Sequence, residues 1–151
     1  MTDLRELYEE VILDHNRNPR NYPKRPVGAN HSAHGFNPLC GDEFQVHLQV
    51  EDGIIKDIGF EGAGCAISTA SASLMTEAIK GITVNDVETL FHDVHALLTE
   101  EKQAGDPTEF LGKLTVLTGV KEYPMRVKCA TLAWHTMLAA LKDDPRSVTT
   151  E

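Results

Sequence analysis

The feature that most limits the fold is an alternating hydrophobic pattern in residues 43–60, which a short turn divides into two halves. The side chains of a strand alternate between its two faces, so apolar residues at every second position indicate a half-buried strand. Four such residues share one side of the first half: Phe44, Val46, Leu48 and Val50. A Glu-Asp-Gly turn follows at 51–53, and residues 54–60 return as a second strand. The pattern predicts an antiparallel β-hairpin.

Helices are expected before and after the hairpin in the sequence, because the apolar residues of those segments follow the helical period. The predicted helices cover residues 4–14, 66–80, 83–98 and 126–141, with a further short helix within 108–124. Gly81 ends the second of them, and Thr83 with Asp86 resembles a capping box that opens the third. This order of elements is typical of an α+β domain. We therefore expect a small antiparallel β-sheet with helices packed on one side.

The remaining segments are predicted to be irregular. Pro19 and Pro23 disfavour regular structure through about Ala33. Residues 101–107 read as a surface loop, and the polar end from Asp143 to Glu151 is expected to fray without contacting the core. The chain is thus interpreted as a single domain over residues 1–151, with flexible ends at 1–3 and 144–151.

The size and charge of the chain exclude several classes of protein. Its 151 residues suit one domain with a core of its own. A net charge of -9 argues against a nucleic-acid binder, which needs a basic face, and suits solubility or a basic protein partner. No apolar run approaches the roughly 18 residues of a membrane-spanning helix. The acidic N-terminus also lacks the apolar centre of a secretion signal, so we expect a cytoplasmic protein.

The first candidate for chemistry is a cysteine two residues before an aspartate. An odd number of cysteines in a reducing compartment argues against a disulfide framework, although a free cysteine is often only a small buried apolar residue. In extended backbone Cys40 and Asp42 point to the same side, so both can approach one cation. Gly41 leaves room for that approach. The alternative is a plain turn that enters the first strand of the hairpin.

The other two cysteines lie at the starts of predicted helices. Cys65 follows a Gly-Ala-Gly turn, and the unpaired N–H groups of a helix N-terminus favour a thiolate. Cys129 follows Arg126 by three residues on one helix face, so the guanidinium would favour its thiolate, and Lys128 adds positive potential. The alternatives are cysteines that only pack in the core and a solvated basic pair.

Three thiolates and one carboxylate would complete a tetrahedral site, and Zn²⁺ suits that mixture of sulfur and oxygen donors. The long separations between the cysteines are not those of a zinc finger, so only tertiary folding could assemble such a site. None of the seven histidines is expected to be a direct ligand, and His34 is the best placed of them. No phosphate-binding loop and no Ser-His-Asp arrangement can be picked out.

Four stretches of the chain together resemble one family: LYEEVILDHNRNPRNY, NPLCGD, GAGCAIS and RVKCATLAW. The resemblance is to the U-type iron–sulfur cluster assembly proteins, which include IscU and the N-terminal part of NifU, and it covers about residues 3–142. IscU-like members carry a histidine directly before the third cysteine, where this chain has Lys128. They also lack the stretch at about 107–124. Both departures are features of the SufU branch, so the chain resembles SufU-type proteins.

This resemblance implies a SufU/IscU-like fold and a zinc-dependent sulfurtransferase. Such a protein accepts persulfide sulfur from a SufS-type cysteine desulfurase and passes it to downstream iron–sulfur scaffold proteins. Carried over by motif, one zinc ion would be held by Cys40, Asp42, Cys65 and Cys129. A desulfurase histidine would replace Cys40 on zinc, and the freed Cys40 would take up the sulfur while Arg126 supports the site electrostatically. The alternatives are a scaffold that assembles a [2Fe–2S] cluster on the same ligands and a structural zinc module that only binds partners.

Overall fold

The computed structural model of the chain describes residues 4–39, 41–99, 124–143 and 148–149. The elements in chain order are α1 (Leu4–Arg17), β1 (His31–Asn37), β2 (Asp42–Glu51), β3 (Ile54–Ala63), α2 (Ala66–Ile79), α3 (Val84–Thr99), α4 (Pro124–Leu141) and β4 (Val148–Thr149). Among the described helices, none has the length and apolar character needed to cross a membrane.

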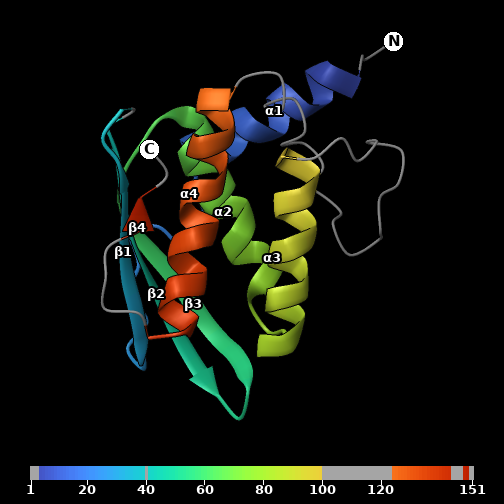
Figure 1. The fold of residues 1–151 in the computed structure, drawn as a ribbon. Helices are drawn as coiled ribbons and strands as arrows, with labels where there is room; N and C mark the ends of the chain where they lie inside the picture. Colours follow the sequence, from blue (N-terminus) through green and yellow to red (C-terminus); the bar gives the residue numbers. More distant parts are fainter. Residues whose placement is uncertain (1–3, 40, 100–123, 144–147, 150–151) are drawn as a thin grey trace.

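The chain folds into two layers, a four-stranded sheet and a group of helices on one of its faces (Figure 1). The strand order is β3-β2-β1-β4, with β2 antiparallel to both β1 and β3, and β4 parallel to β1. Helix α4 packs on β1 and β2, and α2 packs against α1, α4 and β3. The predicted α+β class, the hairpin and the one-sided helix layer are therefore confirmed.

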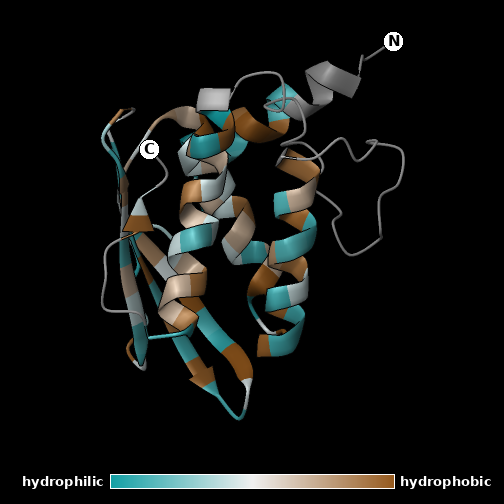
Figure 2. Cartoon of the chain, viewed as in Figure 1, coloured by the Kyte–Doolittle hydropathy of each residue, from teal (hydrophilic) through white to brown (hydrophobic). Residues whose placement is uncertain are grey.

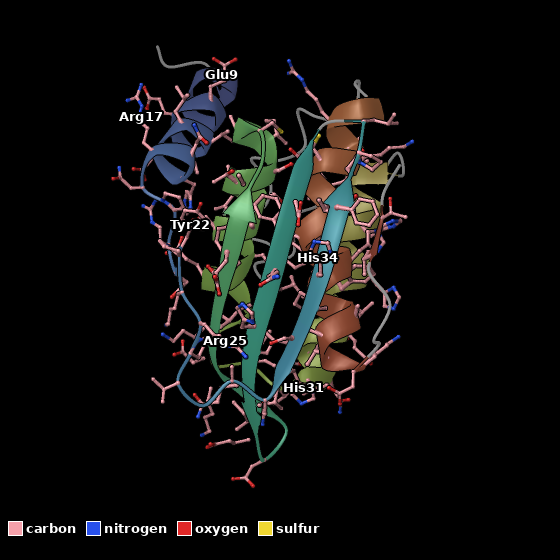
Figure 3. The ribbon with its side chains drawn as sticks, turned by 90° about the vertical axis from the view of Figure 1, so that its left-hand side faces the viewer. Glu9, Arg17, Tyr22, Arg25, His31 and His34 are labelled. Atoms are coloured by element: carbon pink, nitrogen blue, oxygen red, sulfur yellow. The ribbon has the colours of Figure 1, made fainter. Side chains whose placement is uncertain are left out.

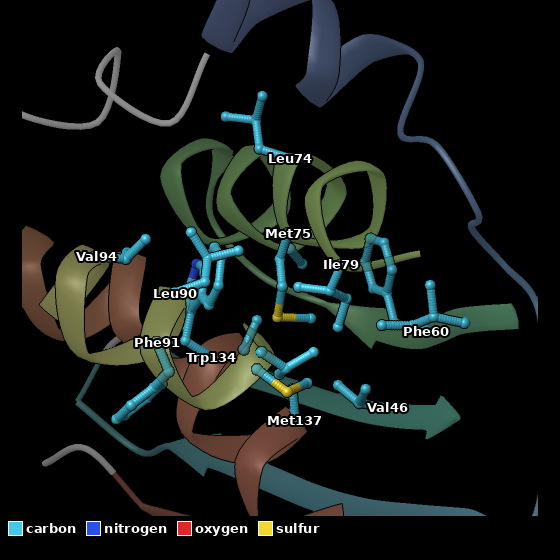
Figure 4. Close-up of a cluster of buried hydrophobic side chains, with 14 of the residues drawn as sticks. Val46, Phe60, Leu74, Met75, Ile79, Leu90, Phe91, Val94, Trp134 and Met137 are labelled. Carbon is cyan, nitrogen blue, oxygen red and sulfur yellow. The ribbon is translucent and has the colours of Figure 1, made fainter. Parts of the chain in front are cut away.

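The core lies between β2 and the helices. The inward residues of β2, Phe44, Val46 and Leu48, are at most 1% exposed, as the alternating pattern predicts. They meet the side chains of α2 and α4, among them Trp134 and Met137 (Figure 4). Apolar and polar residues accordingly alternate along the elements in Figure 2. Helices and sheet hold each other in place because neither apolar surface can be buried alone.

Strand β1 was not predicted from the sequence, in which residues through about Ala33 were expected to be irregular. Its residues include a glycine and few branched apolar side chains, so local propensity does not favour a strand. Tertiary contacts determine it instead, since β1 pairs along its whole length with β2. A Cβ on Gly35 would lie 2.0 Å from Thr136 Oγ1 of α4, so the close approach of helix and sheet needs a glycine here.

Other boundaries also differ from the sequence predictions. Helix α1 continues to Arg17, past the predicted end at Asp14, and β3 continues through Gly62 to Ala63. In the end expected to fray, Val148–Thr149 pair with Gly35 and Phe36 of β1, so this part of the end is ordered against the sheet. Helix α4 begins at Pro124, a residue type suited to the first turn of a helix. The loop predicted at 101–107 lies outside the described residues. Residues 108–123, which hold the predicted short helix, lie outside them as well.

The outer face of the sheet buries one histidine. The alternation of β2 places His47 on this face, yet it is 3% exposed. Its ring hydrogen bonds across both neighbouring strands, with Nδ1 at 2.8 Å from Ser32 Oγ and Nε2 at 2.9 Å from Glu61 Oε1. The segment before β1 passes close to the sheet, as Tyr22 and Arg25 mark in Figure 3. Ser32 and Glu61 thus satisfy the hydrogen bonds of the buried His47 ring, on the face of the sheet that is predicted to carry no helices.

Asp57 of β3 forms an ion pair with Lys24 of the segment before β1 and should contribute to the stability of the fold at neutral pH. Its Oδ1 accepts hydrogen bonds from Lys24 Nζ at 2.7 Å, Lys80 Nζ at 3.3 Å and its neighbour Ile58 N at 2.9 Å. Burial alone would raise the pKa of this carboxyl, but its hydrogen bonds to Lys24, Ile58 and Lys80 outweigh burial and lower the pKa below 3.8.

Replacing Asp57 with asparagine should therefore lower the free energy of unfolding at pH 7 by about 1 kcal/mol, since partial exposure screens the pair. A carboxyl with a depressed pKa stabilises the fold above its unfolded pKa and loses that effect as the pH falls through the folded value. Urea unfolding of both proteins from pH 7 downward should show the difference shrinking below about pH 4. A difference that stays constant with pH would contradict this role of the charge.

Candidate metal centre

Three potential metal ligands from three separate elements meet at one end of the sheet. They are Asp42 at the start of β2, Cys65 before α2 and Cys129 in α4, and their ligand atoms all lie within 4.8 Å of one another. These residues are far apart in sequence, so folding brings them together as a metal site requires. Among the residues that the structure describes, this is the group of three or more cysteines, histidines or carboxylates close enough to hold one metal ion.

Asp42 is buried and held by two hydrogen bonds. It is 1% exposed at the first position of β2, where it pairs in register with Asn37. Its Oδ1 accepts the backbone N–H of Cys65 at 2.8 Å, and its Oδ2 accepts a short hydrogen bond from the hydroxyl of Ser68. A buried carboxylate needs such partners to offset the loss of water. The two bonds also fix the direction of the carboxylate.

Cys65 is the N-cap residue of α2. Its backbone is extended, and its Sγ accepts the N–H of Ser68 at 3.4 Å, as the side chain of an N-cap residue does. The Sγ atom also lies 3.9 Å from Asp42 Oδ2, and the residue is exposed. The sequence predicted this place for Cys65, between a glycine-rich turn and a helix.

Two glycines make the turn before Cys65 possible. Gly62 has a φ of +117°, and a Cβ on it would lie 2.1 Å from the carbonyl oxygen of Glu43. A Cβ on Gly64 would lie 2.7 Å from Phe44 Cζ and 3.0 Å from Asp42 Oδ1. Larger residues at either position would push the end of β3 away from β2, and with it the ligand that follows.

Cys129 lies on the buried side of α4 and is 4% exposed. Its backbone carbonyl oxygen is 3.2 Å from Ser68 Oγ, which connects α4 to the start of α2. Arg126 is exposed three residues earlier on α4 and Lys128 is half-buried. Arg126 and Cys129 both lie within α4, three positions apart, as the sequence predicted. The electrostatic role of Arg126 stays a prediction.

Cys40 lies outside the described residues, so its role as a ligand and sulfur acceptor stays a prediction as well. On one side of it, Leu39 is 62% exposed. On the other, Gly41 has a φ of +74° and donates its N–H to the carbonyl of Asn37 at 2.9 Å. This turn leads directly into Asp42, and in the sequence only Gly41 stands between Cys40 and that ligand.

The histidines considered in the sequence have other neighbours. His34 Nε2 lies 2.8 Å from Glu43 Oε1 on the outer face of the sheet. His95 stacks on Phe91, and its ring centroid is 5.4 Å from that of His135 of α4. Burial, together with the charge of His95, lowers the pKa of His135. The cluster of candidate ligands in the described part of the chain contains no histidine.

The donor set fits a divalent, borderline-soft ion. Two thiolates and a carboxylate place up to three negative charges in a small volume, most of which a divalent cation would offset. Zinc–ligand bonds of about 2.0 to 2.3 Å require donors that lie within about 4 Å of each other in a tetrahedron. The three donors are within 4.8 Å of one another, so only small side-chain shifts are needed. Asp42, Cys65 and Cys129 would hold the ion, and Cys40 would supply the fourth position.

The chain is thus a two-layer α+β domain with one carboxylate and two cysteines gathered at one end of its sheet. The chain belongs to the family described as the NifU-like N-terminal domain, which its residues 7–143 match. The resemblance to the SufU-type and IscU-type proteins of iron–sulfur cluster assembly is thereby confirmed.

Individual relatives carry two different functional names. The chain is 39% identical over 137 residues to the zinc-dependent sulfurtransferase SufU of Bacillus subtilis, covering 89% of each chain. It is 42% identical over 139 residues to the iron–sulfur cluster assembly scaffold protein IscU of Thermotoga maritima, covering 90% of this chain and 93% of the other. A crystal structure described as that of an iron–sulfur cluster assembly scaffold protein for the SUF system, FiSufU from Fervidobacterium islandicum AW-1, has a TM-score of 0.81 at 32% identity, covering 92% of this chain and 99% of that one.

Sequence reasoning missed Ser68, which touches all three described ligand residues. A signal was present, because Ser68 is the third residue after Cys65. The third residue after an N-cap commonly exchanges hydrogen bonds with the capping side chain. The link from Ser68 to Asp42 and to Cys129, in contrast, depends on tertiary packing.

Proposed function

We propose that this protein is a zinc-dependent sulfurtransferase for iron–sulfur cluster assembly in the cytoplasm. It accepts persulfide sulfur from a cysteine desulfurase of the SufS type and passes it to downstream scaffold proteins. The observation that carries the proposal is the convergence of Asp42, Cys65 and Cys129 from three elements onto one ion-sized volume. The similarity to a zinc-dependent sulfurtransferase along most of the chain supports it.

Each residue of the site has a defined task in this proposal. Zinc, when bound, stabilises thiolates near neutral pH without redox chemistry of its own. Asp42, Cys65 and Cys129 hold it, and Cys40 is the nucleophile. The Cys40 thiolate attacks the outer sulfur of the desulfurase persulfide. A new sulfur–sulfur bond forms on Cys40, the old one breaks, and its electron pair leaves with the desulfurase thiolate, so no oxidant or reductant is consumed.

The surface around the site suits approach by a partner protein. Cys65 and Leu39 are exposed, and a cleft of about 430 Å³ lies over the start of β2 and the end of β3, beside the sequence neighbours of Asp42. Its lining includes Gly41, Glu43 and Glu61. A chain with net charge -9 favours association with a basic surface. In the proposal Arg126 stabilises the negative charge on Cys129 and on the arriving persulfide.

A second candidate function is a scaffold that assembles a [2Fe–2S] cluster on the same four ligands. The 42% identity to the IscU scaffold of Thermotoga maritima favours it. Lys128, directly before Cys129, weakens it, because an ammonium group cannot ligate iron as a neutral imidazole does. Anaerobic reconstitution with iron and sulfide separates the two candidates. A stable visible chromophore would establish the scaffold, and a colourless protein would leave the transferase.

The transferase proposal predicts a gain of desulfurase turnover. Adding the zinc-loaded protein to a SufS-type desulfurase with cysteine as substrate should raise alanine production at least about 10-fold, because a nucleophilic thiolate removes the persulfide that limits turnover. Mass spectrometry under non-reducing conditions should then find one added sulfur atom on the peptide that contains Cys40. Unchanged turnover with no persulfide on the chain would rule out the transferase and leave the scaffold and the structural zinc module.

A further inference from the structure

Ser68 places a buried hydroxyl at the centre of the ligand cluster. It is the third residue of α2 and is fully buried. Its Oγ lies within hydrogen-bonding reach of Asp42 Oδ2, 3.4 Å from Cys65 Sγ and 3.2 Å from the carbonyl oxygen of Cys129. One side chain therefore contacts the residue of every described ligand.

The hydrogen bonds of this hydroxyl are not equal. A serine hydroxyl carries one proton, so it can donate to one strong acceptor at a time. Asp42 Oδ2 is the closest of its three neighbours, and a carboxylate oxygen is a stronger acceptor than a cysteine sulfur, so Oδ2 takes the proton. The other oxygen of the same carboxylate, Oδ1, accepts the N–H of Cys65 at 2.8 Å. With both oxygens held, the carboxylate cannot rotate away from the sulfur atoms.

We propose that Ser68 is a positioning residue of the metal centre, whose hydroxyl holds Asp42 Oδ2 in its ligating direction, towards Cys65 and Cys129. The inference rests on the zinc centre of the proposed function and adds a residue to it. Hydrogen-bond partners of metal ligands fix ligand orientation, and their loss costs about 10- to 100-fold in metal affinity. The hydroxyl also keeps Asp42 satisfied before an ion arrives, so the site is preorganised.

A purely structural role is the competing explanation, because Ser68 also links α2 to α4 through Cys129 O. The chain offers a matched control in Ser71, one turn further along α2. It is equally buried, and its hydroxyl donates to the carbonyl of Ala130 at 2.5 Å, so it makes the same kind of link between the same two helices. Ser71 also accepts from Trp134 Nε1 at 3.1 Å. Replacing Ser71 with alanine thus removes a link of the same type outside the ligand cluster.

The test is zinc affinity of the full chain, measured by competition with a chromophoric chelator, after circular dichroism has shown that each variant is folded. Ser68→Ala should bind zinc about 10- to 100-fold more weakly than the wild type, and Ser71→Ala should bind it equally well. With cobalt in place of zinc, the thiolate-to-metal absorption bands should shift in Ser68→Ala only. In an Asp42→Ala background the Ser68 substitution should cost no further affinity.

Four results would overturn the proposal, and three of them come from the alanine variants. They are an unchanged affinity in Ser68→Ala, an equal loss in Ser71→Ala, and a loss from Ser68→Ala that persists in the Asp42→Ala background. Ser68→Thr keeps the hydroxyl and should keep the affinity, so an equal loss in it would also assign the effect to packing. Failure of the wild type to stimulate a desulfurase would remove the proposed function but leave this affinity pattern intact.

Discussion

Replacing Cys129 with alanine should abolish stoichiometric zinc binding. The residue is buried and supplies one of the two described sulfur donors. The described cluster contains no third sulfur that could replace it. Loss of a direct ligand should exceed the effect of losing a hydrogen-bond partner, so the zinc affinity should fall by more than about 100-fold. Chelator competition measures that affinity.

The same substitution should uncouple zinc from stability. A ligand that binds only the folded state adds about 2.7 kcal/mol when present at 100 times its dissociation constant. The melting temperature of the wild type should therefore rise with added zinc, and that of Cys129→Ala should not. Thr131→Ala is a suitable control, because Thr131 is a buried residue of α4 whose hydroxyl bonds within its own helix to Val127 O. A Cys129→Ala protein that zinc still stabilises would place the ion elsewhere.

Replacing Cys40 with alanine should abolish sulfur transfer while leaving weakened zinc binding. The nucleophile is lost, so persulfide formation on the chain and the stimulation of the desulfurase should fall by about 10³-fold or more. Asp42, Cys65 and Cys129 remain to hold the ion, with water in the fourth position. Non-reducing mass spectrometry and alanine production report the transfer, and chelator competition reports the metal.

Cys65→Ala serves as the comparison for this variant. It loses a donor too, but in the proposal it keeps the nucleophile, so its transfer defect should follow its zinc occupancy. A Cys40→Ala protein that still accelerated the desulfurase would show that another group accepts the sulfur. Cys65 would then be the next candidate, since it is the exposed cysteine of the described pair.

The parts of the fold that follow local patterns could be predicted. The hairpin of β2 and β3 follows the alternation of Phe44, Val46 and Leu48, and the place of Cys65 follows from the glycine turn and the helix start. Strand β1 could not be found this way, because its pairing and the contact of Gly35 with Thr136 determine it rather than its own residues. The burial of His47 likewise depends on partners from two other strands.

Three of the four predicted ligand residues lie in the described part of the chain, and the sequence indicated these residues without their geometry. Asp42, Cys65 and Cys129 were singled out by their neighbours in sequence, and the fold then brings them together. The role of Ser68 depends on the contact between the starts of β2 and α2, which no spacing encodes. Contacts between residues far apart in the sequence determine which hydrogen bonds each ligand of a buried site receives, and those hydrogen bonds set the electrostatic environment of the ligand.

The most direct test of the account is X-ray absorption at the zinc edge of the purified, zinc-loaded protein. We expect one zinc per chain, with three sulfur atoms at about 2.3 Å and one oxygen at about 2.0 Å. In Asp42→Ala the oxygen of the carboxylate should be replaced while the three sulfurs stay. A zinc ion surrounded only by nitrogen and oxygen, or no zinc retained at all, would contradict a centre built from Cys40, Asp42, Cys65 and Cys129.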